Sequence, residues 1–132
     1  MRKSLSIILG VLVALLIVWI AGYLYPVPEL ESDDPAALAA IVGSMPVTAK
    51  LLVAGGWFVG SLAGAWLALR ISDWRAAAWI VACVVVVDSV VNILSLPHPF
   101  WMQACAVILP LLGGAFGIRA HHKPYPGEPL LG

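Results

Sequence analysis

The sequence has 132 residues, of which 62% are hydrophobic and 11% are charged, and its formal net charge is zero. A soluble domain carries about 25% charged residues, so this chain has too few of them to cover a surface in water, and its zero net charge gives no bulk attraction to nucleic acid. Several apolar runs reach the roughly 20 residues that a helix needs to cross a bilayer, and they do not alternate in polarity as strands of a membrane barrel do. We therefore expect an all-α bundle of four transmembrane helices in up-down order, with the lipid bilayer as its surroundings.

The first predicted span covers about residues 5–24 and follows Arg2 and Lys3. A basic start before an apolar run also describes a signal peptide, but this run is long and no small-x-small cleavage site ends it. We interpret it as an uncleaved anchor, with Trp19 and Tyr23 in the aromatic belt at the membrane surface.

A long loop over residues 26–48 is expected to contain one short helix. Asp34 suits the N-cap of this helix and Pro35 suits its first turn, whereas Gly43 and Pro46 favour its end. We expect this extracytoplasmic helix to lie on the membrane surface or on the bundle.

The other three spans are predicted at about residues 49–69, 76–96 and 98–118. Together with the first span they make residues 1–120 a single membrane domain. The rest of the chain, 121–132, contains prolines and glycines and is expected to form a flexible cytoplasmic tail.

Basic residues gather at one end of the predicted spans, and only Lys50 lies at the other end. Cytoplasmic loops carry an excess of Lys and Arg, so we expect both termini in the cytoplasm of a bacterium and the multi-pass protein in its inner membrane. This bias argues against small multidrug-resistance transporters and bacterial fluoride channels, four-span proteins that often insert both ways. The residues on the cytoplasmic side are Arg2, Lys3, Arg70, Arg75, Arg119 and Lys123.

A group of polar residues in the second half of the chain forms a candidate intramembrane site. Asp88 lies inside a run of valines, roughly 12 Å from the outer end of its span at 1.5 Å per residue. A charge at such depth costs at least about 2.5–3.5 kcal/mol on the insertion scale, and residues of this kind often mark an ion or proton path. The candidate site comprises Asp88, Asn92, Ser95, His98 and Gln103.

Besides a contact with another protein, two interpretations of Asp88 remain open. The favoured one is structural: a protonated Asp88 hydrogen-bonds a neighbouring helix, and an Asn92–Gln103 bond joins the third and fourth spans. The alternative is an oligomeric module for proton-linked or small-solute transport that uses Asp88 and Asn92. His98, between two prolines, is either an outward titrating group or a polar turn residue.

Small residues repeat every fourth position in several spans, a spacing that lets helix backbones approach closely. We favour packing within the chain over packing against another protein. The positions are Gly56, Gly60 and Gly64 in the second span, Gly113 and Gly117 in the fourth, and Ser6, Gly10 and Ala14 in the first.

No cofactor or metal site is predicted. Cys83 and Cys105 differ by roughly 10 Å in depth along their helices, beyond the reach of a disulfide. His98 lies on the opposite membrane face from His121 and His122, which argues against a haem between them. Phosphate-binding and nucleophile motifs are also missing from the sequence.

The order of these features resembles small four-span bacterial integral membrane proteins with a Pro-His-Pro-x-Trp turn before the fourth helix. The resemblance implies this topology and no activity. With it, we expect a non-enzymatic structural or accessory protein, as a homo-oligomer or in a larger membrane complex. The residues that carry the resemblance are Tyr25, Pro26, Asp34, Pro35, Gly60, Gly64, Arg70, Asn92 and Pro97 to Trp101.

Overall fold

The computed structural model describes residues 1–24, 34–95 and 97–121. Four helices in these ranges are long and apolar enough to cross a membrane, and no strand is present in them, so the all-helical prediction is confirmed. The up-down order in a membrane and the extracytoplasmic position of the short helix stay predictions. The helices are α1 (Arg2–Tyr23), α2 (Pro35–Ser44), α3 (Val47–Ser72), α4 (Arg75–Ser95) and α5 (Phe100–Ala120).

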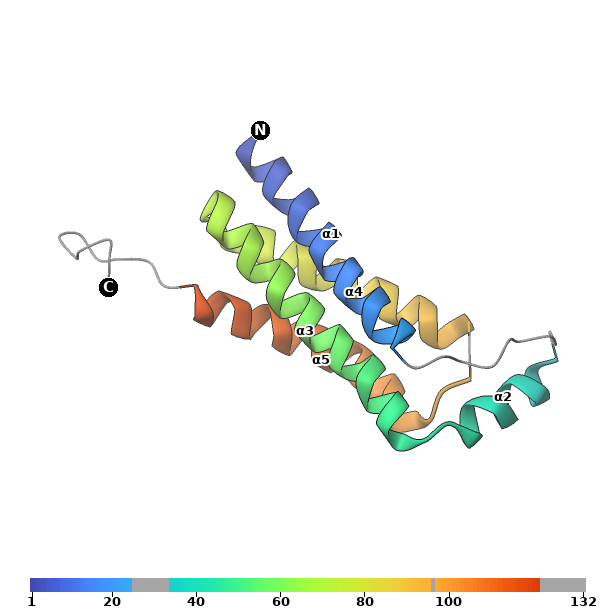
Figure 1. Ribbon diagram of the computed structural model, residues 1–132. Helices are drawn as coiled ribbons and strands as arrows, with labels where there is room; N and C mark the ends of the chain where they lie inside the picture. The colour runs from blue at the N-terminus through green and yellow to red at the C-terminus, as the bar shows by residue number, and fades with distance from the viewer. Residues whose placement is uncertain (25–33, 96, 122–132) are drawn as a thin grey trace.

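The start of α1, the turn between α3 and α4 and the end of α5 meet at one end of the bundle (Figure 1). There Arg2 Nη2 donates a hydrogen bond to the carbonyl oxygen of Ile71 at 2.9 Å. The Lys3 ammonium lies 5.0 Å from the ring centroid of Trp74, within cation–π range. We call this the basic end, and we call the opposite end, where the chain passes through α2, the α2 end.

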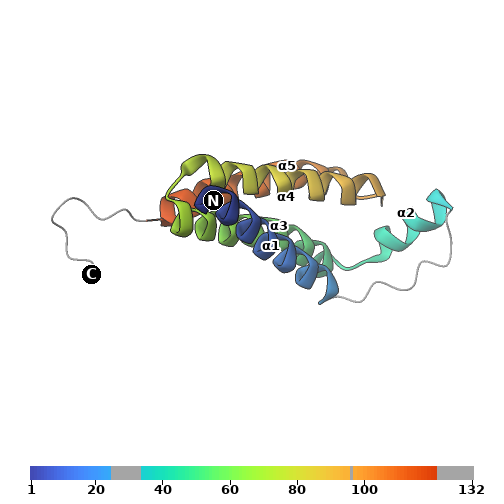
Figure 2. The ribbon, with the colours of Figure 1, turned by 90° about the horizontal axis from the view of Figure 1, so that it is seen from above.

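The short helix α2 stands apart from the four long helices in both views (Figures 1 and 2). Its start is as the sequence predicts, because the Asp34 carboxylate accepts a hydrogen bond from the Ala36 amide at 3.2 Å and Pro35 occupies the first turn. The helix continues through Gly43 and ends at Ser44, one residue later than expected.

Helix α3 is the centre of the bundle, since it contacts α1, α4 and α5, whereas α1 and α5 do not pack on each other in the described residues. Its glycine stripe lies against α1. A β-carbon on Gly60 would lie 2.7 Å from the carbonyl oxygen of Ala14, and one on Gly64 would collide with the carbonyl oxygen of Gly10. The α1–α3 seam therefore depends on these missing side chains.

The second glycine pair lies against the other side of α3. A β-carbon on Gly113 would collide with the carbonyl oxygen of Phe58, and one on Gly117 would lie 2.9 Å from that of Leu62. The small residues of α1 are buried as well, with Ser6 and Ala14 fully inaccessible. Small residues thus form the α1–α3 and α3–α5 seams within the chain.

Candidate functional site between α1 and α4

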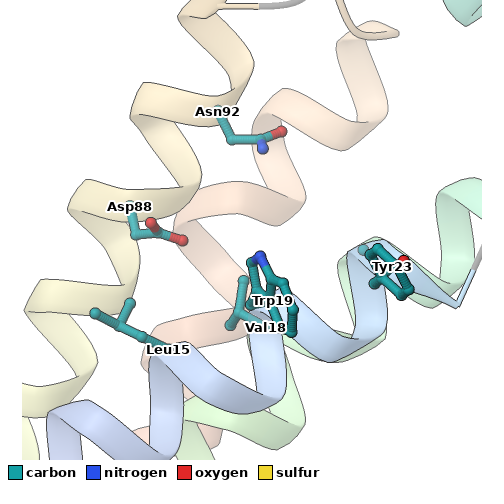
Figure 3. A pocket seen from close by; sticks show the side chains of 7 residues that line it. Leu15, Val18, Trp19, Tyr23, Asp88 and Asn92 are labelled. Atoms are coloured by element: carbon teal, nitrogen blue, oxygen red, sulfur yellow. The ribbon is translucent and has the colours of Figure 1, made fainter. Parts of the chain in front are cut away.

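A pocket of about 500 Å³ lies between α1 and α4, in the half of the bundle near the α2 end. Figure 3 shows the Asp88 carboxyl and the Asn92 amide on α4 projecting to the side where Trp19 stands on α1. We call it the α1–α4 pocket. It is lined by Leu15, Val18, Trp19, Gly22, Tyr23, Asp88 and Asn92.

Asp88 is half-buried and Asn92 is exposed, and neither side chain has a hydrogen bond or ion pair within the described ranges. The sequence-based expectation that Asp88 joins α4 to a neighbouring helix is therefore wrong for this bundle. The expected bond between Asn92 and Gln103 is wrong too. Gln103 Nε2 donates instead to the carbonyl oxygen of His98, at 3.2 Å.

The other predicted polar residues do not reach the pocket. Ser95 is exposed, and its hydroxyl donates to the carbonyl oxygen of Val91 in its own helix at 2.8 Å. His98 is half-buried in the turn before α5. Of the five predicted site residues, the structure thus brings only Asp88 and Asn92 together in one cavity.

Two serines that were not predicted make buried polar contacts between helices. The Ser89 hydroxyl donates to the carbonyl oxygen of Ala106 in α5 at 2.6 Å. The Ser61 hydroxyl of α3 donates to the carbonyl oxygen of Pro110 at 2.6 Å. Both serines are completely buried. The structural role expected of Asp88 therefore belongs to its neighbour in sequence, which points to a different face of α4.

The α1–α4 pocket closes toward the basic end. Ala14, Val81 and Val85, which pack in that direction, are fully buried and belong to the main apolar core of the bundle. Helices α1 and α4 approach closely there because Gly10 of α1 has no side chain. A β-carbon at this position would lie 3.0 Å from a methyl group of Val81 on α4. These buried residues thus end the pocket on the side of the basic end.

Aromatic rings form the α1 side of the pocket near the α2 end. The rings of Trp19 and Tyr23 stack with their centroids 5.5 Å apart and their planes at 21°. Trp19 is 63% exposed and Tyr23 is 76% exposed, so this part of the pocket wall is open to its surroundings. The pocket therefore combines a carboxyl group, an amide, two aromatic rings and an apolar floor.

A second, smaller cavity of about 300 Å³ lies at the basic end and is lined by Leu69, Asp73, Arg75, Ile118 and His121. His121 Nε2 lies 3.1 Å from Asp73 Oδ1, which attaches the end of α5 to the α3–α4 turn. Asp73 holds this position with a left-handed backbone, φ 56°. The sequence predicted His121 as the first residue of a flexible tail, but the structure places it in this contact. Residues 122–132 lie outside the described residues.

The chemistry of these cavities gives no sign of a metal centre. Nowhere in residues 1–24, 34–95 and 97–121 do three or more His, Cys, Asp or Glu side chains gather as metal ligands would. Cys83 and Cys105 are free thiols.

Four long apolar helices joined through small-residue seams define the class of this chain as a multi-pass α-helical membrane protein. Comparisons with protein-family models, with curated proteins and with solved structures found no match for the chain. The function of the chain must therefore be inferred from the chemistry of its site.

Proposed function

We propose that the chain is a non-enzymatic accessory protein of a bacterial cytoplasmic membrane, and that it binds another molecule in the α1–α4 pocket. Its four spans would cross the membrane in up-down order, with the basic end and both termini in the cytoplasm and α2 outside. The uneven distribution of Lys and Arg supports this orientation. The resemblance to small four-span bacterial membrane proteins is in accord with it.

One observation carries the proposal: two polar side chains, Asp88 and Asn92, face the same pocket without a partner in the described residues. Burying a polar group in an apolar medium without a hydrogen bond costs roughly 2–7 kcal/mol, depending on the reference state. The buried serines Ser61 and Ser89 avoid this cost by bonding carbonyl groups. A bound molecule that forms hydrogen bonds with Asp88 and Asn92 would remove this cost in the membrane.

The alternative is an oligomeric module for proton-linked or small-solute transport. The position of the Asp88 carboxyl group inside a predicted membrane span supports this alternative, because such residues often mark an ion or proton path. A path across the membrane would have to continue beyond Asp88, where Ala14, Val81 and Val85 close the pocket. A transport function would therefore need a second copy of the chain or another subunit to complete the path.

Site-directed photocrosslinking in intact membranes tests the binding function. A benzophenone amino acid replaces Trp19 in the pocket or, as a matched control, Trp101, an exposed tryptophan in the first turn of α5. We expect one discrete adduct mass from position 19 that position 101 lacks. The proposal fails if both positions give the same adducts, because the pocket would then meet only bulk lipid.

A further inference from the structure

We propose that the α1–α4 pocket binds an organic ammonium ion carried on a small apolar body. This proposal rests on the proposed function and names the chemical class of the bound molecule. It follows from four properties of the pocket: its single charged group, its aromatic wall, its apolar floor and its size.

No basic residue in the described part of the chain balances the charge of the pocket. Asp88 is the one lining residue that carries a formal charge. The described basic residues lie elsewhere: five of them belong to the basic end, and Lys50, in the first turn of α3, is not among the lining residues. A carboxylate in a site of low dielectric attracts a cation more strongly than it does in water. A ligand of positive charge therefore complements this site, and an anion does not.

The aromatic wall selects an organic cation over a metal ion. Trp19 and Tyr23 present ring surfaces, and the faces of such rings attract ammonium groups, most strongly when the ion is desolvated. Hard divalent metal ions take six or more oxygen ligands, some of them water. The pocket offers such an ion one carboxylate, from Asp88, and the aromatic and aliphatic groups in the rest of its lining are poor surroundings for a hydrated ion.

The floor of the pocket and its size require an apolar part in the ligand. Leu15 and Val18 lie below the polar pair, on α1 (Figure 3). A cavity of about 500 Å³ lies within the range of roughly 300–1,000 Å³ that is typical of small-molecule sites. The ammonium group would lie between Asp88 and the rings, with the apolar body against Leu15 and Val18.

Gly22 keeps part of this space open. It lines the pocket, and a β-carbon at this position would meet no atom within 4 Å. Gly22→Leu should therefore occupy the pocket without disturbing any helix seam, unlike a substitution at Gly60 or Gly64. This difference provides a variant that blocks the site in a folded protein.

The test uses the full chain in dodecyl maltoside, a detergent without an amine, and equilibrium dialysis of radiolabelled benzyltrimethylammonium, with protein-free micelles subtracted. We expect the parent to bind the probe. Asp88→Asn, which keeps the shape of the side chain, and Gly22→Leu should each bind it at least about tenfold more weakly, since about 1.4 kcal/mol corresponds to tenfold. Trp79→Leu, which changes an exposed tryptophan outside the pocket, should bind it like the parent. Neopentylbenzene, the uncharged counterpart of the probe, should not displace it.

A second arm distinguishes two sources of the ammonium group. Displacement of the probe by phosphatidylethanolamine, but not by phosphatidylglycerol, would identify a lipid headgroup as the ligand. The absence of displacement by either would identify a free amphiphilic cation. Both results support an ammonium site.

The proposal is overturned if the folded parent does not bind the probe, or if Asp88→Asn binds it equally well. Thermal unfolding of each variant shows whether it is folded. If position 19 gives a discrete photocrosslinked adduct but the parent does not bind the probe, the pocket binds a molecule that is not an organic ammonium ion. If the parent binds the probe but position 19 gives no such adduct, the ammonium site is retained and the proposed accessory function is rejected.

Discussion

The Ser89 hydroxyl donates to the carbonyl oxygen of Ala106 across the α4–α5 contact, at 2.6 Å. Pro110 lies four residues after Ala106 inside α5, and because proline has no N–H, this carbonyl loses its partner in its own helix. In hydrocarbon such a group must be satisfied by a neighbour. Ser89 supplies that bond, and Ser61 binds the carbonyl of Pro110 itself from α3. Two adjacent helices thus stabilise the proline site of α5.

Ser89→Ala should lower the free energy of unfolding by about 1 kcal/mol, because it leaves the Ala106 carbonyl without a donor. The measurement is reversible unfolding in mixed detergent and SDS micelles. Ser95→Ala is the control, since Ser95 is exposed and bonds only its own helix. Adding Pro110→Ala restores an N–H for Ala106, so the loss from Ser89→Ala should shrink in that background. An undiminished loss would mean that Ser89 acts through packing.

Asp88→Leu should keep or raise the stability of the bundle, in contrast to the change at the adjacent serine. Asp88 has no partner in the described part of the chain, so the substitution removes an unpaired polar group and breaks no bond. The same unfolding assay measures this. A loss as large as that of Ser89→Ala would show that Asp88 holds a structural partner and would contradict the unpaired site.

Gly60→Ala should destabilise the bundle by about 1–3 kcal/mol, the usual cost of overpacking. Its β-carbon would lie 2.7 Å from the carbonyl oxygen of Ala14, and backbone atoms cannot move aside as side chains do. Gly55→Ala is a matched control in the same helix, because its β-carbon meets nothing within 4 Å. We expect the control to be neutral or to gain up to about 1 kcal/mol from helix propensity. Equal losses of stability at the two positions would show that the glycine stripe does not form the α1–α3 contact.

The proposed orientation can be tested by labelling intact cells with a membrane-impermeant thiol reagent. In a background in which both native cysteines are replaced by alanine, Ser44→Cys at the end of α2 should react. Ser4→Cys at the basic end should react only after the membrane is permeabilised. Both positions are exposed in the fold, so burial does not decide the outcome. Reaction of both in intact cells would indicate insertion in both directions.

The four spans were predictable because the length of an apolar run reports on the bilayer and not on tertiary contacts. Their ends were less so: α3 begins at Val47 and ends at Ser72, beyond the predicted 49–69, since Asp73 ends the helix by adopting a left-handed backbone. The glycine spacing indicated close helix packing. Which helix would lie against each stripe depends on the order in which the spans pack, and a single sequence does not encode that order in any local pattern.

The candidate site was predictable only in part. Asp88 and Asn92 are four residues apart, which predicts that they lie on one helix face, and both line the pocket. Ser95 continues the same face, yet it lies outside the pocket, because the lining on α1 extends no further than Tyr23, its last residue. The role of Ser89 required knowing that α5 packs beside it. Pro110 was the available signal, since a proline inside a span predicts an unpaired carbonyl four residues earlier.

The central position of α3 has a consequence for how the chain is assembled during synthesis. The seam between α1 and α3 is complete in the first 72 residues, so this helical hairpin can close while the rest of the chain is still on the ribosome. Helix α5 then needs α3 and α4, but never α1, as neighbours. The α1–α4 pocket forms only when α4 joins the hairpin, so a nascent chain that lacks α4 also lacks this pocket.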